Sequence, residues 1–169
     1  MDDYDSGSDV IDSKAVYKVN DLLLTLDTQI KPHLIDCNNI PLFDGYISVY
    51  KNSYRINKNY VDVFFAQVKG KTQKHSVFKE KITYPIEKDL LRVANRNLGL
   101  VFFVVCMEVP DLYPFQVYYT LLTFDKITKL LDEIKEHDKK SVSLEKFTSL
   151  KEFKMECLKY FDDKDIRLV

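Results

Sequence analysis

The chain has 169 residues, of which 46% are hydrophobic and 30% are charged. This apolar content suffices for one globular domain and excludes a fully disordered chain. The net charge of −1 is unevenly spread, because residues 1–12 hold five Asp and no basic residue while residues 51–81 have a net charge of +6. No apolar run is long enough to span a membrane, and the acidic amino terminus is not that of a signal or transit peptide. We therefore expect a cytoplasmic protein with no membrane partner.

The first half of the chain predicts a helix followed by short strands. Residues 1–12 are expected to form a flexible acidic tail. From Ala15 to Ile30 apolar residues recur at helical spacing, which predicts an amphipathic helix that begins after Ser13 and that Pro32 ends. Alternating and β-branched residues predict short strands over residues 34–37, 44–50, 60–69 and 81–84.

The second half predicts a crossover and a helical end. Residues 87–97 have a helical pattern, and the nearly continuous apolar run of residues 98–109 is typical of a strand buried on both faces. A further strand over 115–124 is followed by two helices, over 125–137 and 148–161. This order favours an α/β fold with a mixed sheet of about five strands flanked by helices, and a C-terminal helical extension over residues 125–169.

Three polar side chains are predicted to meet at one end of this sheet. Asp44 opens one strand, and Gln67 and Lys69 close the next on the same face. In a hairpin, the start of the first strand lies beside the end of the second. A carboxylate, an amide oxygen and the backbone carbonyl of Val68 are hard ligands that suit Mg²⁺ or Mn²⁺. A lysine beside the metal can orient or deprotonate a water and stabilise a pentacovalent phosphate.

The segments 43–47 (FDGYI) and 66–70 (AQVKG), in this order and spacing, resemble the PD-(D/E)xK restriction-endonuclease-like superfamily. The closer likeness is to its (E/Q)xK branch, with Mrr-type nucleases and small domains of bacterial defence proteins. The pattern spans residues 13–124, which would form a restriction-endonuclease-like core. The resemblance implies that Asp44, Gln67 and Lys69 are catalytic, that Asp44 and Gln67 bind metal, and that the protein is a Mg²⁺- or Mn²⁺-dependent nuclease. The implied substrate is nucleic acid, above all double-stranded DNA, in defence against foreign DNA.

One feature of the superfamily is missing from this chain. Many members have a Glu on the first helix as a further metal ligand, and residues 13–30 contain no Glu. By spacing Asp21 is the nearest substitute, but it points away from the apolar stripe, whereas Asn20 and Asp27 flank the stripe and either could reach the sheet end. Weak metal binding would leave a second hypothesis: a catalytically degenerate nuclease fold that binds nucleic acid or protein.

The basic residues, tyrosines and cysteines outside these motifs indicate which partners to expect. Lys71, Lys74, His75 and Lys79 follow the AQVKG segment and suit either a phosphate-binding channel or a solvated loop. Exposed tyrosines around residues 46–60 could serve a homodimer, and a larger defence complex is a further option. Three scattered cysteines without a CxxC spacing give no expectation of a zinc site. Signatures of nucleotide-binding loops and of serine hydrolases are absent from the sequence.

Overall fold

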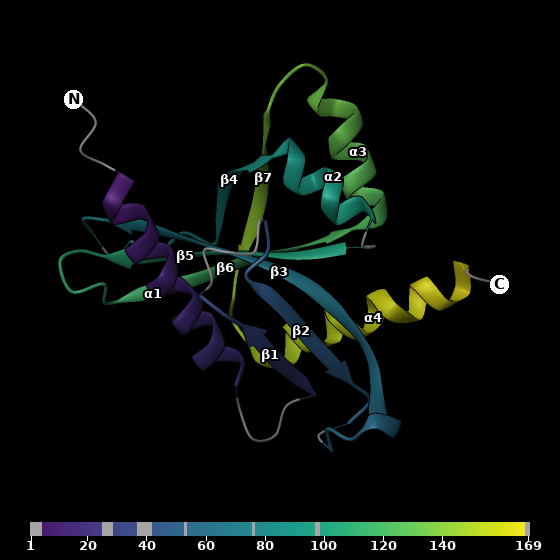
Figure 1. The fold of residues 1–169 in the computed structure, drawn as a ribbon. Coiled ribbons are helices and arrows are strands. Elements are labelled where there is room, and N and C mark those ends of the chain that lie inside the picture. Colours follow the sequence, from purple (N-terminus) through teal and green to yellow (C-terminus); the bar gives the residue numbers. More distant parts are fainter. Residues whose placement is uncertain are drawn as a thin grey trace.

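A computed structural model of the protein describes residues 5–24, 29–36, 42–52, 54–75, 77–96 and 99–167. Four helices and seven strands occupy this described part of the chain (Figure 1). In chain order the elements are α1 (Asp5–Leu23), β1 (Ile30–Leu34), β2 (Gly45–Tyr50), the 3₁₀ turn η1 (Asn57–Asn59), β3 (Tyr60–Gln73), β4 (Lys81–Glu87), α2 (Lys88–Arg96), β5 (Gly99–Glu108), β6 (Phe115–Thr123), α3 (Phe124–Ile134), β7 (Lys139–Lys146) and α4 (Leu150–Arg167).

The strands form one mixed sheet in the order β1-β2-β3-β5-β6-β7-β4. Only β3 and β5 are parallel among the described pairs, and the chain between them passes through β4 and α2. The expected α/β class, the mixed sheet and the crossover are therefore confirmed, with seven strands in place of about five. The predicted helix over 87–97 and the strands over 98–109 and 115–124 are found within two residues of their expected bounds.

The central strand β5 separates two hydrophobic cores. Its side chains alternate between them, so that Phe103 packs with α1 and α4 while Phe102 packs with α2 and α3. In Figure 1, α2 and α3 lie together beside β4 and β7, away from α1. Burial of almost every residue of β5 explains its continuous apolar sequence.

The amino-terminal helix differs from its predicted bounds. It begins at Asp5 and ends at Leu23, so residues 5–12 are helical and not a tail. Ile11 extends the apolar stripe by one turn and packs against the core, which explains the earlier start. The end is also earlier, because Ile30 and Pro32 belong to β1. A proline is tolerated there because β1 is at the edge of the sheet, where one side of the strand needs no partner.

The carboxyl-terminal part contains a strand that was not predicted. Residues Lys139–Lys146 form β7, which pairs with β6 and β4, so residues 125–169 are not a purely helical extension. Val142 and Leu144 are buried between exposed neighbours, which is the period-2 pattern of a strand with one apolar face. Pro85 does not end β4, because this strand is also at a sheet edge.

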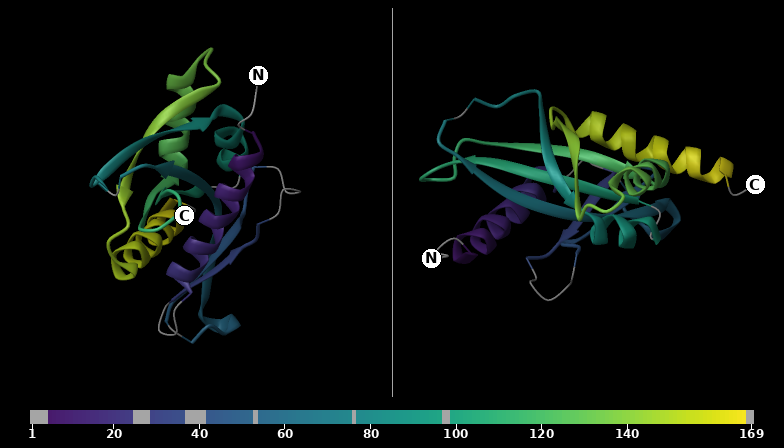
Figure 2. Two further views of the ribbon diagram at one scale, coloured as in Figure 1. Left: turned by 90° about the vertical axis from the view of Figure 1, so that its left-hand side faces the viewer. Right: turned by 90° about the horizontal axis from the view of Figure 1, so that it is seen from above.

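The described helices include none with the length and apolar character needed to cross a membrane. Figure 2 shows the strong twist of the sheet, which carries β4 and β7 out of the plane of β1 and β2. Gln67 and Lys69 of β3 line a cavity together with residues of β4.

Candidate functional site

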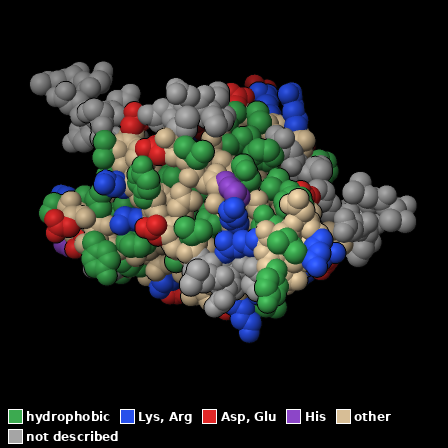
Figure 3. Space-filling view, turned by 60° about the horizontal axis from the view of Figure 1, so that its bottom comes forward, with side chains coloured by type: hydrophobic (Ala, Val, Ile, Leu, Met, Phe, Trp, Pro, Cys, Tyr) green, Lys and Arg blue, Asp and Glu red, His purple; other side chains and the backbone are tan. Residues whose placement is uncertain are grey.

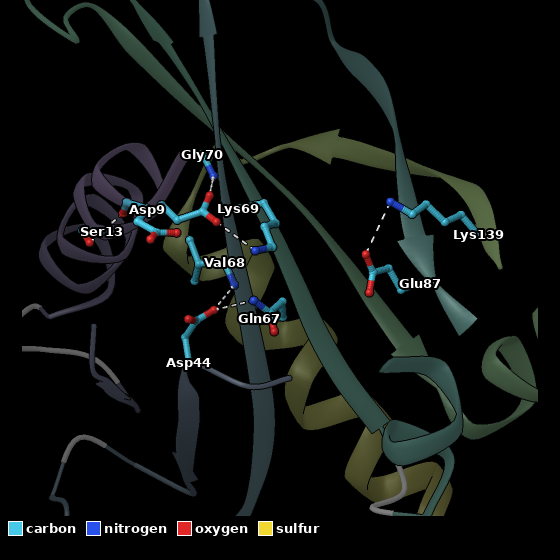
Figure 4. Close-up of polar contacts among 10 residues, drawn as sticks. Asp9, Ser13, Asp44, Gln67, Val68, Lys69, Gly70, Glu87 and Lys139 are labelled. Carbon is cyan, nitrogen blue, oxygen red and sulfur yellow. Dashed lines mark hydrogen bonds and ion pairs between the residues drawn. The ribbon is translucent and has the colours of Figure 1, made fainter. Parts of the chain in front are cut away.

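Asp44 and Gln67 lie side by side because β2 and β3 pair with Gly45 opposite Ala66. The Asp44 N–H donates to the Ala66 carbonyl oxygen at 2.9 Å, which continues the ladder one residue beyond β2. Asp44 Oδ2 accepts hydrogen bonds from Gln67 Nε2 at 2.9 Å and from the Val68 backbone N–H at 2.6 Å (Figure 4). The predicted convergence of these residues is therefore present.

Gly45 sets the position of Asp44. Its φ of +144° is a conformation that other residues rarely adopt. A Cβ atom at this position would lie 2.1 Å from the backbone oxygen of His33, because β1 passes directly beside it. Only glycine therefore allows β2 to begin here and to hold the Asp44 carboxylate against β3.

Lys69 lies on the same strand face as Gln67 and contacts helix α1. Its Nζ forms an ion pair of 2.8 Å with Asp12 Oδ2, and the other oxygen of Asp12 accepts the Gly70 N–H at 2.7 Å. Gly70 permits this approach, because a Cβ there would lie 2.5 Å from both the Cγ2 atom and the backbone oxygen of Ile11. Helix α1 thus brings a carboxylate to the catalytic candidate on β3.

These side chains line one cavity of about 400 Å³ between α1, β3 and β4. Figure 4 shows Glu87 and Lys139 across from Lys69; these two form an exposed ion pair of 3.4 Å. The charged residues on the cavity wall are mostly acidic: Asp9, Asp12, Asp36, Asp44 and Glu87, with Lys69 and Lys139. Such a wall attracts cations, while Lys69 provides one positive charge inside it.

The environment changes the acidity of two of these groups. Burial raises the pKa of Asp44 above its ordinary value, and the charges of Asp12 and Asp36 add to this, while the Val68 N–H and Lys69 oppose it. For Lys69, burial lowers the pKa, but the hydrogen bond and charge of Asp12 together with the charge of Asp44 outweigh this, so the pKa is raised. Lys69 is therefore protonated near neutral pH.

Of the first-helix residues considered as metal ligands, Asn20 and Asp21 do not line the cavity. Asn20 Nδ2 donates to the Leu34 carbonyl oxygen at 2.8 Å and fixes α1 to β1. Asp21 is exposed, and Asp27 lies outside the described residues. The α1 carboxylates at the cavity are Asp9 and Asp12.

Sequence reasoning missed Asp12 because residues 1–12 were interpreted as a tail. The signal was present: Asp9, Asp12 and Val16 are spaced by three and four residues and so share a helix face, and Val16 belongs to the apolar stripe. Extension of the helical pattern through Ile11 would have placed a carboxylate beside the sheet.

The basic residues proposed for nucleic-acid binding separate into two pairs. Lys71 and Lys79 line a second cavity of about 380 Å³ that also lies between β3 and β4. Lys74 and His75 are exposed on the turn after β3, and neither belongs to the residues that line the two cavities described here.

Whether a divalent cation fits this site depends on whether amide and backbone oxygens act as ligands beside the carboxylates. Within the described ranges, no three Asp, Glu, His or Cys side chains are close enough to hold a metal ion by themselves. Mg²⁺, however, commonly takes one or two carboxylates, keeps several waters and completes its shell with substrate phosphates. The Asp44 carboxylate, the Gln67 amide oxygen and the Val68 carbonyl suit that kind of open site and not a closed structural one.

Comparison with family models, with curated proteins and with solved structures finds no match to this chain. Its function must therefore be argued from the geometry of the site.

Proposed function

We propose that this protein is a metal-dependent nuclease that hydrolyses phosphodiester bonds of nucleic acid. The observation that carries this proposal is the convergence of Asp44, Gln67, Lys69 and Asp12 in one cavity. Hard-metal ligands and a fixed positive charge at the same point both promote phosphodiester hydrolysis, and these residues offer both.

The order of elements around the site supports a relationship to the PD-(D/E)xK superfamily. A helix, a strand that begins after Asp44, a strand with Gln67 and Lys69, a helix and a buried strand occur in this order, with β1 and β4 as additional strands between them. In this proposal, Asp12 on α1 is the counterpart of the first-helix Glu of that superfamily. Action in bacterial defence stays a proposal that depends on this resemblance alone.

Each residue has a distinct task in the proposed reaction. Asp44 is the main metal ligand, and Gln67 and the Val68 N–H orient its carboxylate. The bound cation would supply Lewis-acid stabilisation and lower the pKa of a water. Because Lys69 is protonated, it acts as a cation on the negative phosphate oxygens and not as the base. Asp12 keeps this ammonium in position.

A second candidate function is a nucleic-acid-binding module with the fold of a nuclease but without its activity. The ion pair between Asp12 and Lys69 favours it over a nuclease, because an ammonium group paired with a carboxylate stabilises the charge that develops on phosphate during cleavage less strongly. The same conclusion follows if the donors at Asp44 are too few to hold a cation.

Cleavage assays separate the two candidates. Plasmid, linear duplex and single-stranded DNA and RNA are incubated with the protein in EDTA, Mg²⁺ or Mn²⁺, with Lys69→Ala and the exposed-surface control Lys58→Ala in parallel. The nuclease proposal predicts metal-dependent cleavage that Lys69→Ala abolishes and Lys58→Ala retains. Retention of binding without cleavage in any metal would favour the binding module.

A further inference from the structure

A second cavity continues the candidate site along the same two strands. On β3, Gln67 and Lys69 line the first cavity, while Lys71 and Gln73 line the second. On β4, the residues from Tyr84 onward line the first cavity and those from Lys81 to Thr83 the second. Same-face residues on a strand are about 7 Å apart, so the two cavities are immediate neighbours.

The second cavity is positively charged where the first is acidic. Lys71, Lys79 and Lys81 line it, with the hydroxyls of Thr83 and Ser143. Lys81 forms an exposed ion pair of 2.7 Å with Glu145, whereas Lys71 and Lys79 form none with the described part of the chain. Within the described residues, Lys71 and Lys79 thus line this cavity without a carboxylate ion-pair partner, and such an arrangement favours anionic phosphates.

The wall of this cavity is held in place from beneath. The buried Tyr118 donates its hydroxyl hydrogen to the Lys79 carbonyl oxygen at 2.7 Å, which fixes the segment before β4 against the sheet. Burial raises the pKa of Tyr118 to about 12, so this hydroxyl stays a donor at neutral pH. This hydrogen bond ties the backbone of Lys79 to β6.

The size of the cavities limits what they can hold. Volumes of about 400 and 380 Å³ lie in the range of small-molecule pockets, so each cavity can enclose a short stretch of one strand and not a whole duplex. On the face drawn in Figure 3, basic side chains of the described residues are scattered among acidic and hydrophobic ones.

We infer that the second cavity binds the phosphates of a single nucleic-acid strand next to the bond that the first cavity positions. The strand runs between β3 and β4, with Lys69 at one phosphate and Lys71 and Lys79 at the next ones. The placement of the cleaved bond in the first cavity rests on the proposed function. Binding of a strand at the second cavity, however, can be measured without cleavage.

The test is fluorescence anisotropy in EDTA with labelled oligo(dT), oligo(U) and a duplex of equal length. The double variant Lys71→Gln/Lys79→Gln is compared with wild type and with Lys51→Gln/Lys58→Gln, which removes two exposed charges that line neither cavity. Loss of two phosphate contacts should reduce the slope of log affinity against log salt by about 1.4 and weaken single-strand binding roughly 25-fold at 0.1 M salt.

Each possible outcome either supports or overturns the inference. Tighter binding of a single strand than of the duplex, lost in the cavity variant and kept in the control, supports it; the dT and U probes then show whether DNA or RNA is the ligand. Preference for the duplex, equal loss in both variants, or absence of single-strand binding overturns it. Cleavage is not needed for this readout, so a failure of the nuclease proposal is recognised separately.

Discussion

The Asp44 carboxyl lies in a partly buried environment in which its ionised form is unfavourable. Burial raises its pKa, and this outweighs the Val68 N–H and Lys69, which stabilise the charged form. An acid whose pKa is higher in the folded than in the unfolded chain contributes stability at low pH, and that contribution is lost as the pH rises through the folded pKa. At neutral pH the ionised Asp44 therefore reduces stability, as is common for residues retained for function.

This leads to a prediction for two substitutions of Asp44. Asp44→Asn keeps an oxygen that can accept from the Val68 N–H and removes the buried charge, so the free energy of unfolding at pH 7 should stay equal or rise. Asp44→Ala leaves that N–H without its acceptor and should lower it by about 1–3 kcal/mol. Urea denaturation checks both, and equal destabilisation by the two variants would contradict the argument.

A second prediction concerns the effect of the Asp12 charge on the pKa of the Asp44 carboxyl. Asp12 contributes to the raised pKa of Asp44, so Asp12→Asn should move the titration of the Asp44 carboxyl, and the acidic limb of any pH–rate profile, to lower pH. NMR titration of the carboxyl carbon measures the first directly. The control is Asp21→Asn, an exposed α1 residue that should leave the titration unchanged; an upward shift in Asp12→Asn would refute the coupling.

At the scale of elements, the contact between α1 and β3 completes the site. Gly70→Ala would place a Cβ 2.5 Å from the Ile11 backbone oxygen, so the helix must move away. We expect a loss of about 1–3 kcal/mol in the free energy of unfolding and weaker pairing of Asp12 with Lys69. Truncation by Ile11→Ala should not restore stability, because the backbone clash remains.

The matched control for this contact is Thr72→Ala, an exposed residue two positions further on β3, which should change stability by less than about 0.5 kcal/mol. Chemical denaturation of the variants provides the measurement. Wild-type stability in Gly70→Ala would mean that α1 does not need this close approach.

The pairing of β2 with β3 could be predicted from the sequence because both strands alternate and the period of two fixes which side chains share a face. Asp44, Gln67 and Lys69 were found in this way. The bounds of α1 could not be predicted as well, since the five Asp of residues 1–12 obscured the apolar spacing of Ile11. Tertiary contact with Gly70, which no local pattern records, stabilises that turn of helix.

β7 was missed for a different reason. Its apolar residues are only Val142 and Leu144, within a segment of Lys, Ser and Glu. A strand this polar gains stability mainly from pairing with β4 and β6, and pairing between distant segments is not visible in one sequence. The alternation of a strand is present in this segment, but it is carried by these two buried positions alone.

At the scale of the whole molecule, residues beyond the segment 13–124 contribute to the hydrophobic core. Phe147, Phe153 and Phe161 after residue 124 are buried in the core that contains α1. A fragment of residues 13–124 would expose that core and lack Ile11 and Asp12. We predict that it does not fold, with no cooperative thermal transition by circular dichroism; a cooperative transition would contradict this.

The most direct test of the proposed function is single-turnover cleavage of labelled nucleic acid by wild type and Asp44→Asn, with melting temperatures measured in the same samples. We predict cleavage in Mg²⁺ or Mn²⁺ that EDTA abolishes and that falls at least 100-fold in Asp44→Asn while its melting temperature is maintained. A variant that cleaves as fast as wild type, or wild-type cleavage that persists in EDTA, would contradict a metal-dependent site at Asp44.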